Sequence, residues 1–234
     1  MAKGAALSFE SGGRTISVER FDAGGGGRRP TVLLLHGADG MTNADRYRLG
    51  AQVLSNAGYH VFLVHYLDRT GERRAYFSTI GRGFALWADA VRDAVDFVAR
   101  LPGVDPMRLG IVGTSLGGAL AVTVAADDRR VKAVVNYFGF LPEAVRENAR
   151  RLPPMLVLHG ARDVIVPVAN AYALEALLIR LGAPHEVHVY ADQAHGFHGA
   201  AQLDAAQRTA AFLNRHLGGR SASLAPEAVP ETAD

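Results

Sequence analysis

Six short runs of apolar, strand-favouring residues recur along the chain, and segments long enough to form a helix separate them. The runs span residues 31–37, 60–66, 108–114, 132–138, 154–160 and 185–191, and the helix-length segments span 44–57, 83–101, 116–126, 142–150, 168–181 and 203–217. Most runs are apolar at consecutive positions, as in parallel strands that helices cover on both faces. The alternation predicts an α/β fold with a mostly parallel, doubly wound sheet and helices on both faces. An N-terminal antiparallel hairpin is expected over residues 9–21.

The chain length and composition favour one domain. Hydrophobic residues make up 49% of the 234 residues, which is enough for one large core, and we expect a single domain over residues 1–217. The stretch Gly24–Pro30 (GGGGRRP) predicts a loop between two strands. Residues 218–234 are rich in Ala, Pro, Ser and Glu, which predicts a disordered C-terminal tail.

Charge and cysteine content exclude several classes of function. The 25 basic and 23 acidic residues nearly balance, which disfavours nucleic acid or an anionic membrane as the main partner. The chain has no cysteine, so disulfides, thiolate metal sites and a cysteine nucleophile are excluded. Neither a signal peptide nor a membrane-spanning run is recognisable, and we therefore expect a cytoplasmic protein.

The stretch Leu109–Ala121 reads LGIVGTSLGGALA and places Ser115 between an apolar run and a helix-forming run. Gly-x-Ser-x-Gly between a strand and a helix is typical of a nucleophile elbow, because small residues at 113 and 117 let the chain pass close to a strained serine. The glycine spacing does not fit a dinucleotide-binding loop, and Ala119 stands where a phosphate-binding loop needs lysine. Ser115 is the predicted nucleophile.

A serine needs a base, and the base needs an orienting acid. Asp163 follows the run that ends at 160, and His195 follows the run that ends at 191. Loops at the carboxyl ends of parallel strands meet at one edge of the sheet, and the order Ser, Asp, His suits this architecture. We therefore predict Asp163 and His195 as the other two catalytic residues. Asp192 and His198 stay open as an alternative acid and base.

An acyl-transfer reaction also needs amide donors for its oxyanion. One normally comes from the residue after the nucleophile, which here is Leu116. The loop HGADG follows the first parallel run, and its glycines allow a tight path. The amides of Ala38 and Leu116 are therefore the predicted oxyanion hole.

These motifs resemble the α/β-hydrolase superfamily, and within it the dienelactone hydrolase-like family, over about residues 31–217. The resemblance rests on LLLHGADG, GTSLGGALA, MLVLHGARDVIVP and YADQAHGF, on the short length without a large lid insertion, on Phe197 after His-Gly, and on Leu86-Trp87. It implies the α/β-hydrolase fold and hydrolysis of a small carboxylic ester or lactone through an acyl-enzyme intermediate.

Two positions depart from the cysteine-using members of that family. Those proteins have cysteine where Ser115 stands, with a glutamate that controls it, and here Gly37 occupies the aligned glutamate position. They also have an arginine shortly after the catalytic histidine, and AHGFHGA has none. The resemblance to a serine variant therefore implies a general carboxylesterase rather than an enzyme for the dienelactone substrate.

Specificity is expected from the long, basic and aromatic segment 67–84, with Arg73 and Arg74 among the candidates for an acidic substrate. The predicted pocket residues are His36, Tyr66, Arg82, Trp87 and Phe197, although a solvated basic loop and a core tryptophan are the simpler interpretation. The residues His185, Glu186 and His188 do not form a closed ligand set, and we expect no metal and no other cofactor.

Two other functions remain open at this point. An acyltransferase or a thioesterase can use the same triad, and a hydrolase scaffold can also serve as a non-catalytic binding module. The expected partner is a small-molecule ester or lactone, without nucleic acid or membrane. The sequence leaves monomer and homodimer as alternatives.

Overall fold

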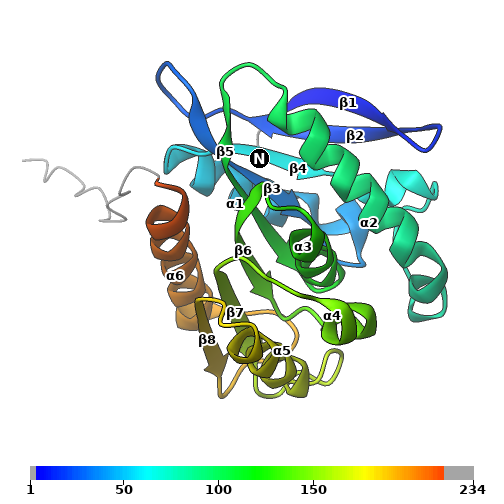
Figure 1. Ribbon diagram of the computed structural model, residues 1–234, viewed down its shortest axis with the longest axis vertical. Coiled ribbons are helices and arrows are strands. Elements are labelled where there is room, and N and C mark those ends of the chain that lie inside the picture. Colours follow the sequence, from blue (N-terminus) through cyan, green and yellow to red (C-terminus); the bar gives the residue numbers. More distant parts are fainter. Residues whose placement is uncertain (1–3, 219–234) are drawn as a thin grey trace, which may run out of the picture.

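The computed structural model describes residues 4–218, and its strands form one eight-stranded sheet in the order β1-β2-β4-β3-β5-β6-β7-β8 (Figure 1). The strands are β1 (Ala5–Ser11), β2 (Arg14–Phe21), β3 (Arg29–Leu35), β4 (His60–Val64), β5 (Val104–Thr114), β6 (Val131–Tyr137), β7 (Met155–Gly160) and β8 (His185–Tyr190). β1 and β2 form the expected antiparallel hairpin, β2 also pairs antiparallel with β4, and all other pairs are parallel. Apart from Gly218, the predicted tail lies outside the described residues.

Helices cover both faces of this sheet. They are α1 (Ala44–Asn56), α2 (Phe77–Ala99), α3 (Leu116–Asp127), α4 (Glu143–Asn148), α5 (Ala169–Arg180) and α6 (Gly199–Leu217), with short 3₁₀ turns η1 (Gly40–Asn43) and η2 (Tyr66–Arg69). Buried side chains of α2, α3 and α5 belong to one core, and those of α1 and α6 belong to a second core across the sheet. Figure 1 shows α6 well apart from α2 and α3. The predicted α/β architecture is therefore confirmed.

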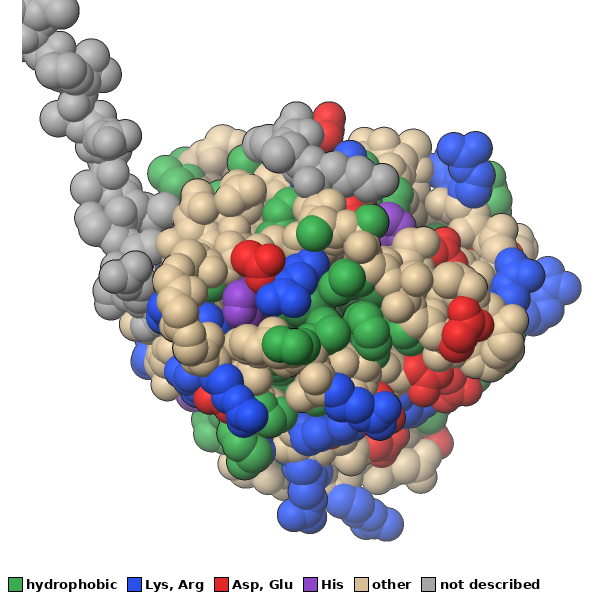
Figure 2. All heavy atoms as spheres, turned by 90° about the horizontal axis from the view of Figure 1, so that it is seen from above, with side chains coloured by type: hydrophobic (Ala, Val, Ile, Leu, Met, Phe, Trp, Pro, Cys, Tyr) green, Lys and Arg blue, Asp and Glu red, His purple; other side chains and the backbone are tan. Residues whose placement is uncertain are grey.

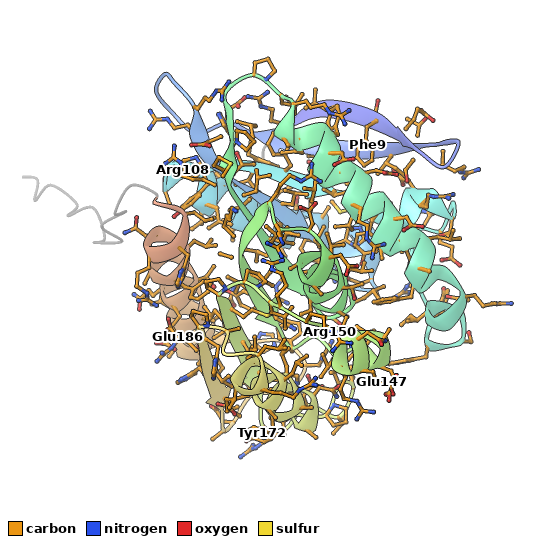
Figure 3. All side chains as sticks on the ribbon, viewed as in Figure 1. Phe9, Arg108, Glu147, Arg150, Tyr172 and Glu186 are labelled. Atoms are coloured by element: carbon orange, nitrogen blue, oxygen red, sulfur yellow. The ribbon has the colours of Figure 1, made fainter. Side chains whose placement is uncertain are left out.

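The central strands are apolar on both faces because each face meets a helix layer. On β3, Leu33 and Leu35 join the core under α2 and α3, whereas Val32 and Leu34 join the core under α1 and α6. Side chains fill the space on both sides of the sheet (Figure 3). Phe9, labelled there on β1, stacks on Phe97 of α2 with ring centroids 5.3 Å apart. That contact packs the N-terminal hairpin against the same layer.

Helix α2 begins at Phe77 rather than at Gly83, so the prediction of a loop over 67–84 is wrong in its second half. Gly81 and Gly83 favour a loop in the sequence, but packing overrides that preference. A Cβ atom on Gly83 would overlap the indole ring of Trp87, so the glycine lets this buried ring pack against its own helix. Only residues 70–76 lie between η2 and α2.

Figure 2 shows one face of the molecule, on which basic and acidic side chains both occur around a group of hydrophobic ones. This pattern agrees with the near balance of charge in the sequence. Within residues 4–218, no helix combines the length and the apolar character that crossing a membrane requires.

The start of α3 passes directly beneath the end of β3. A Cβ atom on Gly117 would collide with the backbone carbonyls of Leu35 and His36, so no side chain fits there. We expect Gly117→Ala to lower the free energy of unfolding by about 2 kcal/mol or more, because backbone must move to relieve the overlap. Urea unfolding measures this. Gly50→Ala, in open space on α1, is the matched control and should raise stability by about 0.5–1 kcal/mol. Equal effects at the two sites would contradict this account.

Candidate active site

Ser115 occupies the turn between β5 and α3 in a strained backbone conformation. Its φ is 52° and its ψ is −117°, and its N–H donates to the carbonyl of Tyr137 at 2.8 Å. Within residues 4–218, Ser115 and Phe138 are the only non-glycine residues with positive φ, and both line the same cleft. Such strain costs on the order of 1–3 kcal/mol and persists only where surrounding structure enforces it.

Three side chains predicted from the sequence form a chain of two hydrogen bonds, with His195 in the middle. Ser115 Oγ lies 2.9 Å from His195 Nε2, and His195 Nδ1 lies 2.7 Å from Asp163 Oδ2. An ionised carboxylate only accepts, so this geometry places a proton on Nδ1 and leaves Nε2 to accept from the serine hydroxyl. The alternatives Asp192 and His198 are exposed, and neither takes part in these two bonds.

Backbone amides hold the buried carboxylate of Asp163. Oδ1 accepts the N–H groups of Ile165 and Val166, both at 2.9 Å, and Oδ2 is left facing His195. Behind it, His159 Nε2 donates to the Val166 carbonyl at 2.8 Å and lies 3.4 Å from Asp163 Oδ2. Burial lowers the pKa of His159, which keeps this ring neutral beside the acid. The loop after β7 therefore presents one fixed carboxylate oxygen to His195.

An aromatic ring supports His195 from the end of β6. The Phe138 ring meets the imidazole edge to face, with centroids 4.8 Å apart. Phe138 also contacts Phe197 at 5.2 Å, which anchors it in the core. Phe138 has a positive φ where the chain turns at the end of β6. The strained residue is therefore the one whose ring packs against His195.

The two amides predicted as oxyanion donors border the same cleft as Ser115. Leu116 is the first residue of α3, where the helix itself supplies no acceptor for the N–H group. Ala38 lies in the loop after β3, and its carbonyl accepts the N–H of Ala75 at 2.8 Å. The arrangement can therefore present two amide donors beside the serine hydroxyl.

The cleft above Ser115 has a volume of about 460 Å³. Its apolar wall comes from Tyr76, Phe77, Ile80, Leu116, Phe138, Phe140, Ile165 and Val166, and its polar lining includes Asp39, Asn43, Arg46, Tyr47, Arg74 and Thr114. A cleft of this size with a mostly apolar wall suits a small organic molecule.

The structure corrects the predicted pocket residues, since none of the five borders this cleft. Tyr66, Trp87 and Phe197 are fully buried core residues, because their apolar rings fill the layers behind the loops. His36 is also buried and borders a second cavity behind the loop, together with Arg73. Arg82 is exposed on α2. From the predicted specificity segment, Arg74, Tyr76 and Phe77 do border the cleft.

Sequence reasoning did not single out several cleft residues, and four large ones among them come from two places in the fold. Arg46 and Tyr47 come from α1, and Phe138 and Phe140 follow β6. No motif marks them, because a helix face and an aromatic residue after a strand are common in any α/β sheet. Only the packing of α1 beside the loop after β3 reveals them.

A sequence profile of the dienelactone hydrolase family matches residues 21–216, which is most of the chain. The chain belongs to the dienelactone hydrolase family. The family is one of α/β hydrolases, and the sheet and its helices have the α/β-hydrolase fold.

Individual relatives are more distant. "Uncharacterized peptidase YuxL" of Bacillus subtilis is 24% identical over 231 residues, with 80% of this chain and 35% of that protein covered. "Putative carboxymethylenebutenolidase" of Yersinia pestis is 30% identical over 142 residues, with 53% of this chain and 52% of that protein covered. The present chain therefore spans about a third to a half of the length of these relatives.

A solved structure has the same fold. The dienelactone hydrolase-like promiscuous phosphotriesterase from metagenomic libraries superposes with a TM-score of 0.81 at 20% identity, covering 92% of this chain and 98% of that one.

Among residues 4–218 of the present family member, no group of three His, Asp or Glu side chains is placed to hold a metal ion.

Buried histidines around the site make the stability of the protein sensitive to acid. Burial lowers the pKa of His36 to about 4, and burial also lowers the pKa of His65 and of His159. The unfolded chain takes up a proton on each ring near pH 6.5, whereas folded His36 does so only near pH 4. The unfolded state therefore binds more protons in this range, and the free energy of unfolding should fall by up to about 3 kcal/mol from His36 as the pH drops from 6.5 to 4.

Urea unfolding at several pH values between 7.5 and 4.5 measures this loss. His36→Gln keeps an amide donor but has no titrating ring, so its free energy of unfolding should fall less over the same range. Equal slopes for this variant and the unsubstituted protein would contradict a neutral buried His36.

Proposed function

We propose that this member of the dienelactone hydrolase family is a serine hydrolase that cleaves a small carboxylic ester or lactone through an acyl-enzyme. The observation that carries the proposal is the chain of two hydrogen bonds from Ser115 through His195 to Asp163, at 2.9 and 2.7 Å. Nucleophile, base and orienting acid in contact are the arrangement that such chemistry needs.

In the first half of the reaction, Ser115 Oγ attacks the carbonyl carbon while His195 Nε2 takes its proton. Asp163 holds the ring in the Nδ1–H tautomer and stabilises the imidazolium that forms. The amides of Leu116 and Ala38 donate to the oxyanion of the tetrahedral intermediate. His195 then returns the proton to the leaving oxygen, which departs as an alcohol and leaves an ester on Ser115.

In the second half, a water molecule attacks the acyl-enzyme and gives its proton to His195. Collapse of the second intermediate breaks the bond to Ser115 Oγ and releases the acid, and His195 gives its proton to Oγ, which restores the Ser115 hydroxyl. If an alcohol or amine takes the place of water, the same steps transfer the acyl group instead. Product analysis with a competing alcohol distinguishes a hydrolase from an acyltransferase.

The rim of the cleft indicates an ester with an apolar group. Tyr76 is 58% exposed and Phe77 is 78% exposed, and both border the cleft beside Ile165. Large exposed apolar side chains gathered at a site mark surface that a ligand covers. We therefore propose that the substrate places an apolar acyl or alkyl group against Tyr76 and Phe77.

Replacing the nucleophile should nearly abolish activity. We expect Ser115→Ala to lower kcat on p-nitrophenyl acetate by roughly 10³-fold or more, because the remaining groups cannot form an acyl-enzyme. Steady-state kinetics measures this, and a fluorophosphonate probe should label the unsubstituted protein but not the variant. Ser78→Ala, an exposed serine on α2, is the control that should keep both signals. Retained turnover in Ser115→Ala would rule out the mechanism, and failure of the unsubstituted protein to label would favour a binding module.

An ester and an amide substrate with the same acyl group distinguish the proposed esterase from a peptidase, the alternative that the name of the Bacillus subtilis relative raises. We expect faster turnover of a p-nitrophenyl ester than of the p-nitroanilide with the same acyl group. Preferred cleavage of the anilide would instead assign peptidase activity to the same three residues.

Shortening the rim should affect long substrates more than short ones. We expect Phe77→Ala to raise KM for p-nitrophenyl octanoate about 5- to 20-fold while changing KM for the acetate little, because a longer chain loses apolar contact area. Met107→Ala, an exposed apolar residue on β5, is the control and should change neither value. Equal effects on both substrates would place the acyl chain elsewhere.

A further inference from the structure

The loop after β3 has to hold the Ala38 amide still, although its sequence GADG favours flexibility. This loop lies against the nucleophile, since a Cβ atom on Gly37 would be 3.6 Å from Ser115 Cβ. Small displacements of a donor from the oxyanion position cost much of its stabilising effect. The contacts that fix the loop therefore bear directly on the proposed reaction.

Two tyrosine hydroxyl groups hold opposite ends of the His36–Gly37 peptide. Tyr66 donates to the carbonyl of His36 at 2.8 Å, and the N–H of Gly37 donates to the hydroxyl of Tyr47 at 2.9 Å. Both tyrosines are buried, so neither bond competes with bulk water. This peptide cannot rotate without breaking a buried hydrogen bond at one end or the other.

The next peptide is the one that carries the Ala38 amide. The carbonyl of Gly37 accepts from His36 Nδ1 at 2.8 Å, from the N–H of Gly40 at 3.1 Å and from the Tyr66 hydroxyl at 3.3 Å. In a trans peptide the N–H points opposite to the C=O, so these donors aim the Ala38 N–H away from themselves. The lowered pKa of His36 agrees with this arrangement, because the neutral ring with its proton on Nδ1 suffices as the donor.

The hydroxyl group of Tyr47 contacts two different residues of this loop. Having accepted the Gly37 N–H, its hydroxyl donates to Asp39 Oδ1 at 2.7 Å, and Asp39 Oδ2 accepts from Asn43 at 2.9 Å. The two residues that the Tyr47 hydroxyl contacts, Gly37 and Asp39, lie on either side of Ala38 in the sequence. From α1, Tyr47 therefore spans the residue whose amide is the proposed oxyanion donor.

We propose that Tyr47 is a positioning residue for the oxyanion hole, which fixes the Ala38 amide by binding the Gly37 N–H and the Asp39 carboxylate at once. The proposal rests on the proposed function of the same site. It does not require Tyr47 to touch the substrate, because the hydroxyl proton is used by Asp39. Its effect is expected on the transition state, where charge develops on the carbonyl oxygen, more than on substrate binding.

The test is Tyr47→Phe, which removes the hydroxyl and keeps the ring. We expect kcat on p-nitrophenyl acetate to fall about 10- to 100-fold with KM changed less than about 3-fold, as for a misplaced oxyanion donor. Binding of a trifluoromethyl ketone, whose adduct with Ser115 carries an oxyanion, should weaken by the same factor as kcat/KM falls. Rates are normalised to the concentration of sites that a fluorophosphonate labels, so unfolded protein does not count.

Tyr190→Phe is the matched control. Like Tyr47, Tyr190 donates its hydroxyl proton to an aspartate at 2.7 Å, but its partner Asp204 is not part of the loop after β3. It should keep kcat within about 2-fold. Asp39→Ala removes the acceptor and leaves Tyr47 in place; we expect a smaller loss, and the double variant with Tyr47→Phe should be no worse than Tyr47→Phe alone, because both act through one network.

Unchanged kcat in Tyr47→Phe, or additive losses in the double variant, would overturn the positioning role. If Tyr47→Phe does not fold, Asp39→Ala with the ketone decides, and unchanged ketone binding there would overturn the role as well. Full activity in Ser115→Ala would instead overturn the proposed function itself, so the two failures are distinguishable.

Discussion

The close approach of the β5–α3 turn to the end of β3 is the contact on which the site depends. Ser115 adopts a positive φ there, and the missing side chain of Gly117 lets α3 start against the carbonyls of Leu35 and His36. Because those carbonyls lead into the loop that carries Ala38, one contact sets both the nucleophile and the loop beside it. A side chain at Gly117 would separate the two.

The parallel sheet supplies the remaining parts of the site. Loops after β3, β7 and β8 reach the same edge as the turn after β5, which is how His195 meets a serine 80 positions earlier in the chain. Backbone amides, buried tyrosines and histidines hold the loops after β3 and β7. Rearranging the polar groups behind these loops would cost free energy, because no water replaces a buried hydrogen bond that breaks.

The family match and the proposed substrate contacts rest on different features of the molecule. The match covers residues 21–216, which include β3 to β8 and the loops that carry Ser115, Asp163 and His195. The proposed rim is formed by Tyr76, which ends the segment between η2 and α2, and by Phe77, the first residue of α2. The proposed ester chemistry rests on the serine at position 115 and on this apolar rim.

The sequence by itself determined the strand and helix order, the turn at Ser115, and the positions of Asp163 and His195 at strand ends, because periodicity and glycine spacing are local properties. Tertiary structure decided which aromatic residues border the cleft. Tyr66 and Phe138 both stand at the end of an apolar run, yet Tyr66 is a core residue and Phe138 contacts His195. Likewise, nothing in the sequence of α1 joins Tyr47 to Gly37 and Asp39. Those contacts join separate segments, and only the packing of the whole chain brings them together.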